Sequence, residues 1–159
     1  MLRLMRRCLL LISVLLLICQ NPVHAMRIEN DSVVCKEYNL LMQVRGHEVT
    51  AICIMNIEAD AHVVGTIINE FGVKVFDFTY DNGKAQILNV IGPLDKWYIR
   101  KVLKGDFSFI LSNIGRGENA VKKKRRLDIM PNGDISVCNE RYKINYLFTP
   151  IKTQNEIDK

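Results

Sequence analysis

Short turns between apolar segments constrain the fold of this chain more than any other feature of its sequence. Five apolar segments follow one another with only two to four residues between them, at 38–44, 48–57, 62–70, 73–80 and 85–91. The turn Asp81-Asn82-Gly83-Lys84 carries the strongest hairpin signal, because Asn-Gly readily adopts the positive φ angles of a tight turn. Parallel neighbours need a long crossover, so these segments predict an antiparallel sheet.

A helix is predicted after Gly92-Pro93, where apolar residues begin to recur every three and four positions. We expect it to run from about Leu94 to Ile114, bent at Gly105, with Asp106 capping a second segment. Its apolar face consists of Ile99, Val102, Leu103, Phe107, Ile110, Leu111 and Ile114. Two closing strands are expected at 135–138 and 142–151.

Several of the predicted strands are apolar on both faces, as where Val73 and Val75 oppose Phe76 and Phe78. A sheet with one wet face should alternate cleanly, so this sheet is either partly covered on both sides or curled around its concave face. The predicted fold class is α+β and mainly antiparallel β. We expect a curved, unclosed, β-barrel-like sheet of seven or eight strands, with the bent helix on its concave face, forming one domain at 37–151.

The first 25 residues have the layout of a signal peptide. Three arginines precede an apolar run from Cys8 to Cys19, which at about 12 residues is shorter than the ~20 that span a bilayer. Small residues at Val23 and Ala25 predict cleavage after Ala25 and export of the chain. The alternatives are an uncleaved anchor, or lipidation at Cys19, where bulky Ile18 makes a poor lipobox. A flexible leader at 26–36 and a tail at 152–159 complete the predicted organisation.

The predicted signal and one cluster account for the excess of positive charge in the sequence. Without the three signal arginines, 22 − 3 = 19 basic residues face 17 acidic ones, and five of the 19 lie in the run Lys122–Arg126. This balance gives no support to nucleic acid as a partner. The run is interpreted as a solvated loop, with a membrane surface as the alternative partner through Lys122–Arg126.

Cys35, Cys53 and Cys138 remain after removal of the signal. An oxidising compartment permits one disulfide, for which Cys35 and Cys138 are the candidate pair, and free cysteines are the alternative. Cys53 lies in the apolar run AICIM and is interpreted as a buried small hydrophobe.

The sequence contains no recognisable catalytic constellation, so we expect a protein that is not an enzyme and that uses no cofactor or metal. Only His47 and His62 survive removal of the signal, and neither has a partner at zinc-ligand spacing. A minor alternative is an enzyme that uses a Cys53–His62 pair, or Asp77 with a pKa raised among aromatic rings.

The stretch VVGTIINEFGVKVFDFTYDNGKAQILNVIGPLDKWYIRKVLKGDFSFIL, at 63–111, resembles bacterial envelope proteins. It is similar to uncharacterised exported proteins of Bacteroidetes and, more distantly, to the lipoprotein carrier and outer-membrane lipoprotein receptor group (LolA/LolB-like). The residues that fit the strand of that pattern are Gly72, Val75, Phe76, Phe78 and Tyr80. Those that fit the following helix are Trp97, Val102, Leu103 and Phe107.

The resemblance implies an open half-barrel in which helices plug the concave side and leave an apolar cavity for acyl chains. It implies a lipid or an acylated lipoprotein as partner, and a location in the bacterial periplasm, with anchoring to the outer membrane as a variant. The residues expected to line or gate the cavity are Ile67, Phe76, Phe78, Tyr80, Leu88, Trp97 and Phe107. The alternative function is a structural or protein-interaction module whose aromatic rings form an ordinary closed core without a ligand.

Overall fold

The computed structural model describes residues 33–58 and 60–152. The predicted signal peptide at 1–25, Cys19 and nearly all of the predicted tail lie outside these residues. The strands are β1 (Val34–Val44), β2 (His47–Ile57), β3 (Val63–Asn69), β4 (Lys74–Asp81), β5 (Lys84–Leu88), β6 (Ala120–Lys122), β7 (Arg125–Ile129), β8 (Ile135–Asn139) and β9 (Ile144–Pro150). The helical elements are the 3₁₀ turn η1 (Gly92–Leu94) and the helix α2 (Trp97–Ile114).

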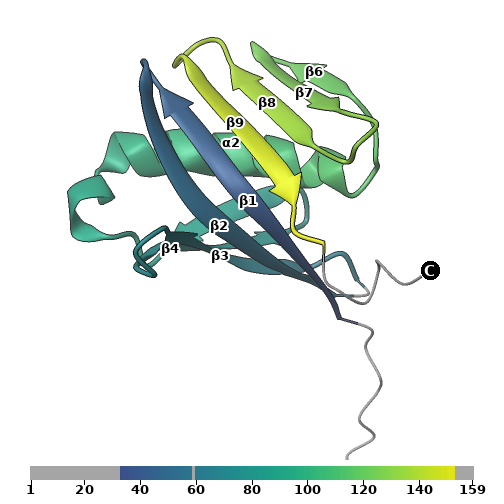
Figure 1. Ribbon diagram of the computed structural model, residues 1–159, viewed down its shortest axis with the longest axis horizontal. Helices are drawn as coiled ribbons and strands as arrows, with labels where there is room; N and C mark the ends of the chain where they lie inside the picture. Colours follow the sequence, from purple (N-terminus) through teal and green to yellow (C-terminus); the bar gives the residue numbers. More distant parts are fainter. Residues whose placement is uncertain (1–32, 59, 153–159) are drawn as a thin grey trace, which may run out of the picture. The chain divides into compact units, whose positions relative to one another are not determined.

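One antiparallel sheet contains all nine described strands, in the order β5-β4-β3-β2-β1-β9-β8-β7-β6. It is curved and not closed, and α2 lies across its concave face (Figure 1). The predicted α+β class, with a curved, unclosed sheet and one helix, is therefore confirmed. The chain enters α2 from β5 at one edge of the sheet and continues into β6 at the opposite edge.

The sheet has nine strands rather than the seven or eight predicted, because the basic run is part of a hairpin. β6 and β7 pair across Lys123 and Lys124, whose φ angles are 48° and 62°. Positive φ at both central positions is what a tight hairpin turn requires, and Asn or Gly is the usual occupant. The expected solvated loop at 122–126 was therefore wrong. The prediction failed because lysines in these positions give no turn signal in the sequence.

The helix α2 is continuous from Trp97 to Ile114, so no second helical segment begins at Asp106 as predicted. Asp106 lies within the helix rather than at its start, and its side chain is completely buried. Gly105 serves another purpose: a Cβ atom there would lie 2.8 Å from a guanidinium nitrogen of Arg125. The glycine gives up helix propensity and makes room for that side chain.

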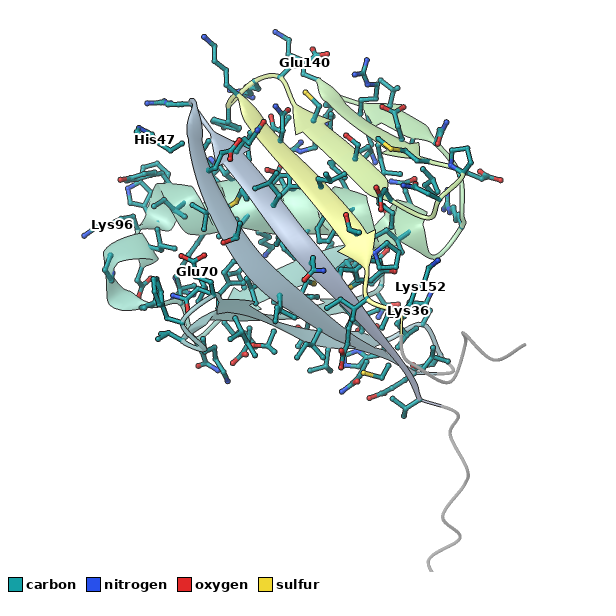
Figure 2. All side chains as sticks on the ribbon, in the orientation of Figure 1. Lys36, His47, Glu70, Lys96, Glu140 and Lys152 are labelled. Atoms are coloured by element: carbon teal, nitrogen blue, oxygen red, sulfur yellow. The ribbon has the colours of Figure 1, made fainter. Side chains whose placement is uncertain are left out.

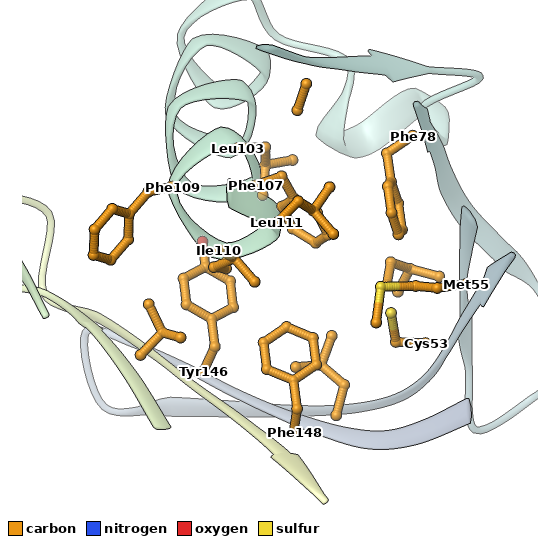
Figure 3. Close-up of a cluster of buried hydrophobic side chains, with 14 of the residues drawn as sticks. Cys53, Met55, Phe78, Leu103, Phe107, Phe109, Ile110, Leu111, Tyr146 and Phe148 are labelled. Atoms are coloured by element: carbon orange, nitrogen blue, oxygen red, sulfur yellow. The ribbon is translucent and has the colours of Figure 1, made fainter. Parts of the chain in front are cut away.

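The core lies between α2 and the concave face, and its densest part is a cluster of aromatic rings (Figure 3). The rings of Phe78 and Phe107 lie 4.9 Å apart between centroids, and Phe107 meets Tyr146 edge-on at 6.4 Å. Phe78 fits because β3 has a glycine opposite it: a Cβ on Gly65 would lie 2.3 Å from the Phe78 ring. Burying each such ring contributes roughly 1.5–3 kcal/mol.

The apolar residues on the outer face have a different environment. Ile52 and Val64 are 38% and 40% exposed, so nothing in the described residues covers this side of β2 and β3. Of the two explanations for two-sided strands, curling around the concave face is the one that the structure supports. None of the described helices has the length and apolar character needed to cross a membrane.

Candidate ligand cavity

An apolar cavity of about 480 Å³ lies between the N-terminal half of α2 and the concave face of the sheet. Strands β1, β2, β3, β4 and β9 and the loop before β9 supply its wall. The lining residues are Leu40, Met42, Val44, Arg45, Val49, Ala51, Ile67, Val75, Phe76, Leu94, Tyr98, Ile99, Val102, Leu103, Phe107, Tyr142, Ile144 and Tyr146. This volume falls within the roughly 300–1,000 Å³ typical of small-molecule sites.

The position of the cavity follows the change in side-chain burial along α2 and β2. Val102 is half-buried on the helix, and Ala51 is half-buried on β2, both beside the space. Five residues further along α2, Phe107 is completely buried, and two residues further along β2, so is Cys53. The cavity therefore closes where the side chains of both elements become completely buried.

The cavity lies at the end of the sheet where three connections meet. The β1–β2 turn, the loop before β9 and the start of α2 all contribute lining residues, namely Arg45, Tyr142 and Tyr98. In Figure 2, His47 and Lys96 mark this end of the described domain. The backbone N–H of Arg45 donates to the carbonyl of Lys143 at 3.2 Å, which joins the β1–β2 turn to the loop before β9.

Three of the seven residues predicted to line a cavity do line this one: Ile67, Phe76 and Phe107. Phe78 was predicted with them but is completely buried in the aromatic cluster, over Gly65. The alternating rings of β4 therefore divide between two environments, with Phe76 at the cavity and Phe78 in the core.

The remaining three predicted residues do not border the cavity. Tyr80 lines a separate polar hollow beside the C-terminal half of α2. Leu88 is 39% exposed at the end of β5, outside the cavity lining. Trp97 is 75% exposed, and its ring packs edge-on against that of Tyr98, a lining residue, at 6.0 Å between centroids. Trp97 is thus a neighbour of the cavity rather than part of its wall.

Sequence analysis missed most of the wall that β1 and β9 provide. Leu40, Met42 and Val44 alternate along β1, and Ile144 and Tyr146 alternate along β9. The period-two spacing was visible, but only the pairing of β1 with β9 places these faces opposite the helix.

A buried polar cluster joins the helix to strands β7, β8 and β9, next to the closed part of the core. Asp106 accepts hydrogen bonds from Arg125 Nε at 2.6 Å, Asn139 Nδ2 at 2.6 Å and Tyr146 OH at 2.8 Å. Burial, reinforced by the Asp106 charge, raises the pKa of Tyr146 well above its usual range. The phenol therefore stays neutral and acts as a donor, and Arg125 of the basic run points inward to Asp106 rather than to solvent.

The candidate acid of the enzyme hypothesis has the opposite character from the one expected. Partial burial raises the pKa of Asp77, but hydrogen bonds from Asn89 at 2.7 Å and from Lys74 at 3.1 Å outweigh it and hold the pKa below its usual value. Asp77 is thus an ionised, paired carboxylate. Burial raises the pKa of Cys53 to about 12, so its thiol stays protonated and is a poor nucleophile.

The predicted pair Cys35 and Cys138 is not bonded, and the strand register separates the two residues. Cys138 pairs with Asn145, which pairs with Gln43, eight residues along β1 from Cys35. Eight residues of strand span roughly 26 Å, whereas a disulfide needs Cα atoms within about 7 Å. Within the described residues, no group of three or more His, Cys, Asp and Glu side chains is placed to hold a metal ion.

No protein-family model matches this chain, and no curated protein matches it either.

Proposed function

We propose that this protein is a non-catalytic envelope protein that binds an apolar moiety, the acyl chain of a lipid or lipoprotein, in the cavity beneath the N-terminal half of α2. The observation that carries the proposal is the cavity itself, whose wall is built almost entirely from aliphatic and aromatic side chains. The proposal extends to a role in lipid or lipoprotein trafficking, and it agrees with the resemblance to the LolA/LolB-like group and with the predicted export signal.

The energetic argument favours a long apolar chain. Each buried methylene contributes about 0.8 kcal/mol, so about ten methylenes gain roughly 8 kcal/mol before the entropic costs of binding. Arg45 is the one charged residue among those that line the cavity, so a polar ligand would find few partners inside it. Chemistry on a substrate is not part of the proposal, because the wall offers no nucleophile beside a base.

The test is a titration of delipidated protein with a fluorescent fatty acid, followed by the emission of Trp97, the single tryptophan of the chain. We expect saturable binding and a change in Trp97 emission, because its ring packs against Tyr98 at the cavity. Val102→Phe should abolish most of the binding, since the larger side chain occupies the space that the ligand needs.

The matched control is Val64→Phe, the same substitution on the exposed outer face of β3. It should leave binding unchanged. No saturable binding by the unmodified protein, together with no lipid retained after purification, would instead favour a structural or protein-interaction module.

A further inference from the structure

A second hollow adjoins the apolar cavity and differs from it in chemistry. It is an open, largely polar depression of about 680 Å³ at the tips of β1, β2 and β9. Its lining consists of Gln43, Arg45, Gly46, Glu48, Arg141, Tyr142, Lys143 and Asn145. Arg45 and Tyr142 line both hollows, so these two side chains border both spaces.

The depression carries an excess of positive charge. Three cations, Arg45, Arg141 and Lys143, line it together with one carboxylate, that of Glu48. Glu48 accepts a hydrogen bond from Gln43 Nε2 at 2.7 Å. None of these three cations takes part in an ion pair within the part of the chain that the structure describes. Elsewhere in the domain, Arg100, Arg125 and Arg126 all have carboxylate partners.

The backbone brings two of these cations together at the junction. Arg45 and Lys143 both have left-handed φ angles, 51° and 56°, in positions that usually favour Gly or Asn. The N–H of Arg45 donates to the carbonyl of Lys143, so the two turns lie side by side. Arg45 and Gly46, with φ angles of 51° and 90°, form the tight β1–β2 turn, which fixes the Arg45 backbone at the strand tips.

We infer that the ligand is an anionic amphiphile, with its acyl chain in the apolar cavity and its carboxylate or phosphate head group in the adjoining depression, bound by Arg45 together with Arg141 and Lys143. This inference rests on the proposed function, because it assigns the head group of the same ligand. Guanidinium groups form paired hydrogen bonds with both carboxylates and phosphates, so the geometry specifies the charge of the head group and leaves its chemical type to the experiment.

The experiment compares three probes that share one oleoyl chain: oleate, oleoyl lysophosphatidic acid and 1-oleoylglycerol, which is neutral. Affinities come from the emission of Trp97 in delipidated protein at low and high salt. A charge-assisted hydrogen bond corresponds to about tenfold in affinity or more, so at least one anionic probe should bind about tenfold more tightly than the neutral one. High salt should reduce that ratio.

Variants test which cation is responsible. Arg45→Gln should bring the ratio of anionic to neutral affinity close to one, and Arg45→Lys should restore part of it. Arg116→Gln is the matched control, because Arg116 lines a different hollow beyond the C-terminal end of α2, and this variant should keep the full ratio. Thermal unfolding of each variant verifies that it is folded.

The outcomes separate the two proposals. Preference for oleate, for the phosphate or for both supports the inference and identifies the head group. Equal binding of all three probes, unaffected by Arg45→Gln, overturns the inference while the acyl-binding function stands. Absence of binding by every probe overturns both.

Discussion

The two halves of α2 do different work on the same concave face. The C-terminal half, from Asp106 to Ile114, contains Phe107, Phe109, Ile110 and Leu111, all of which are buried. In the N-terminal half, Tyr98 is exposed, Ile99 and Val102 are half-buried, and all three border the cavity. The closed half packs the helix against the sheet, and the other half can border an open space because its partner holds the helix in place.

The polar cluster at Asp106 should give the largest effect when it is broken. Asp106→Leu removes the acceptor shared by Arg125, Asn139 and Tyr146, and leaves buried donors without a partner. We expect a loss of at least about 3 kcal/mol in the free energy of unfolding, measured by urea denaturation.

The control for this variant is a surface ion pair in β7, the strand that also carries Arg125. Arg126→Ala breaks the pair with Asp128, in which both side chains are largely exposed, and should cost less than about 1 kcal/mol. Equal effects of the two substitutions would contradict the idea that the cluster anchors the helix.

The same substitution, isoleucine to alanine, can be made in each half of the helix to compare their contributions to stability. Ile110→Ala in the closed half should cost about 2–5 kcal/mol, because the residue is 1% exposed and leaves a void. Ile99→Ala borders space that is already open, and should cost about 1 kcal/mol for the apolar area lost. Chemical denaturation of both variants provides the measurement, and a larger cost at Ile99 would reverse our assignment of the two halves.

The contrast between residues that border the cavity and residues buried in the core also holds along β2. It predicts that the stability of the domain falls at alkaline pH. Ala51 borders the cavity, whereas Cys53 is completely buried and has a pKa raised from 9.0 to about 12. The unfolded chain loses this proton near pH 9 and the folded chain holds it, so the stability present below pH 9 declines as the pH rises towards 12.

By about pH 10 this loss should reach roughly 1.4 kcal/mol, since one pKa unit corresponds to 1.36 kcal/mol. Denaturation curves at about pH 8 and pH 10 provide the measurement, and Cys53→Val should remove most of the difference between them. A difference that persists in Cys53→Val would assign the alkaline sensitivity to other groups, of which Tyr38 and Tyr146 have pKa values raised by burial.

Local patterns predicted the strands and the helix because their signals lie within a few residues of one another. The Asn82-Gly83 turn and the apolar spacing from Ile99 to Ile114 are examples. The β6–β7 hairpin was not predicted, because Lys123 and Lys124 adopt positive φ angles in places where Asn or Gly is usual. Asp106 was misassigned although its spacing from Leu103 and Ile110, by three and four, already placed it on the buried face.

The cavity could be predicted only in part, because it depends on which side chains meet across the trough. Phe76 and Phe78 carry the same sequence signal, yet one faces open space and the other fits over Gly65. That distinction requires the register of β3 with β4 and the position of α2. The resemblance directed attention to β4 and the helix, and the opposing wall on β1 and β9 emerged only from the strand order.

The route of α2 from one sheet edge to the other restricts how anything can reach the space below it. The segment 89–96 joins the helix to β5, and the still shorter segment 115–119 joins it to β6. Because both ends of the helix are tied to edge strands, movement of α2 away from the sheet would pull on β5 and β6. For the ligand that we propose, this favours entry lengthwise between the tips of the strands, where the cavity lining includes Arg45 and Tyr142.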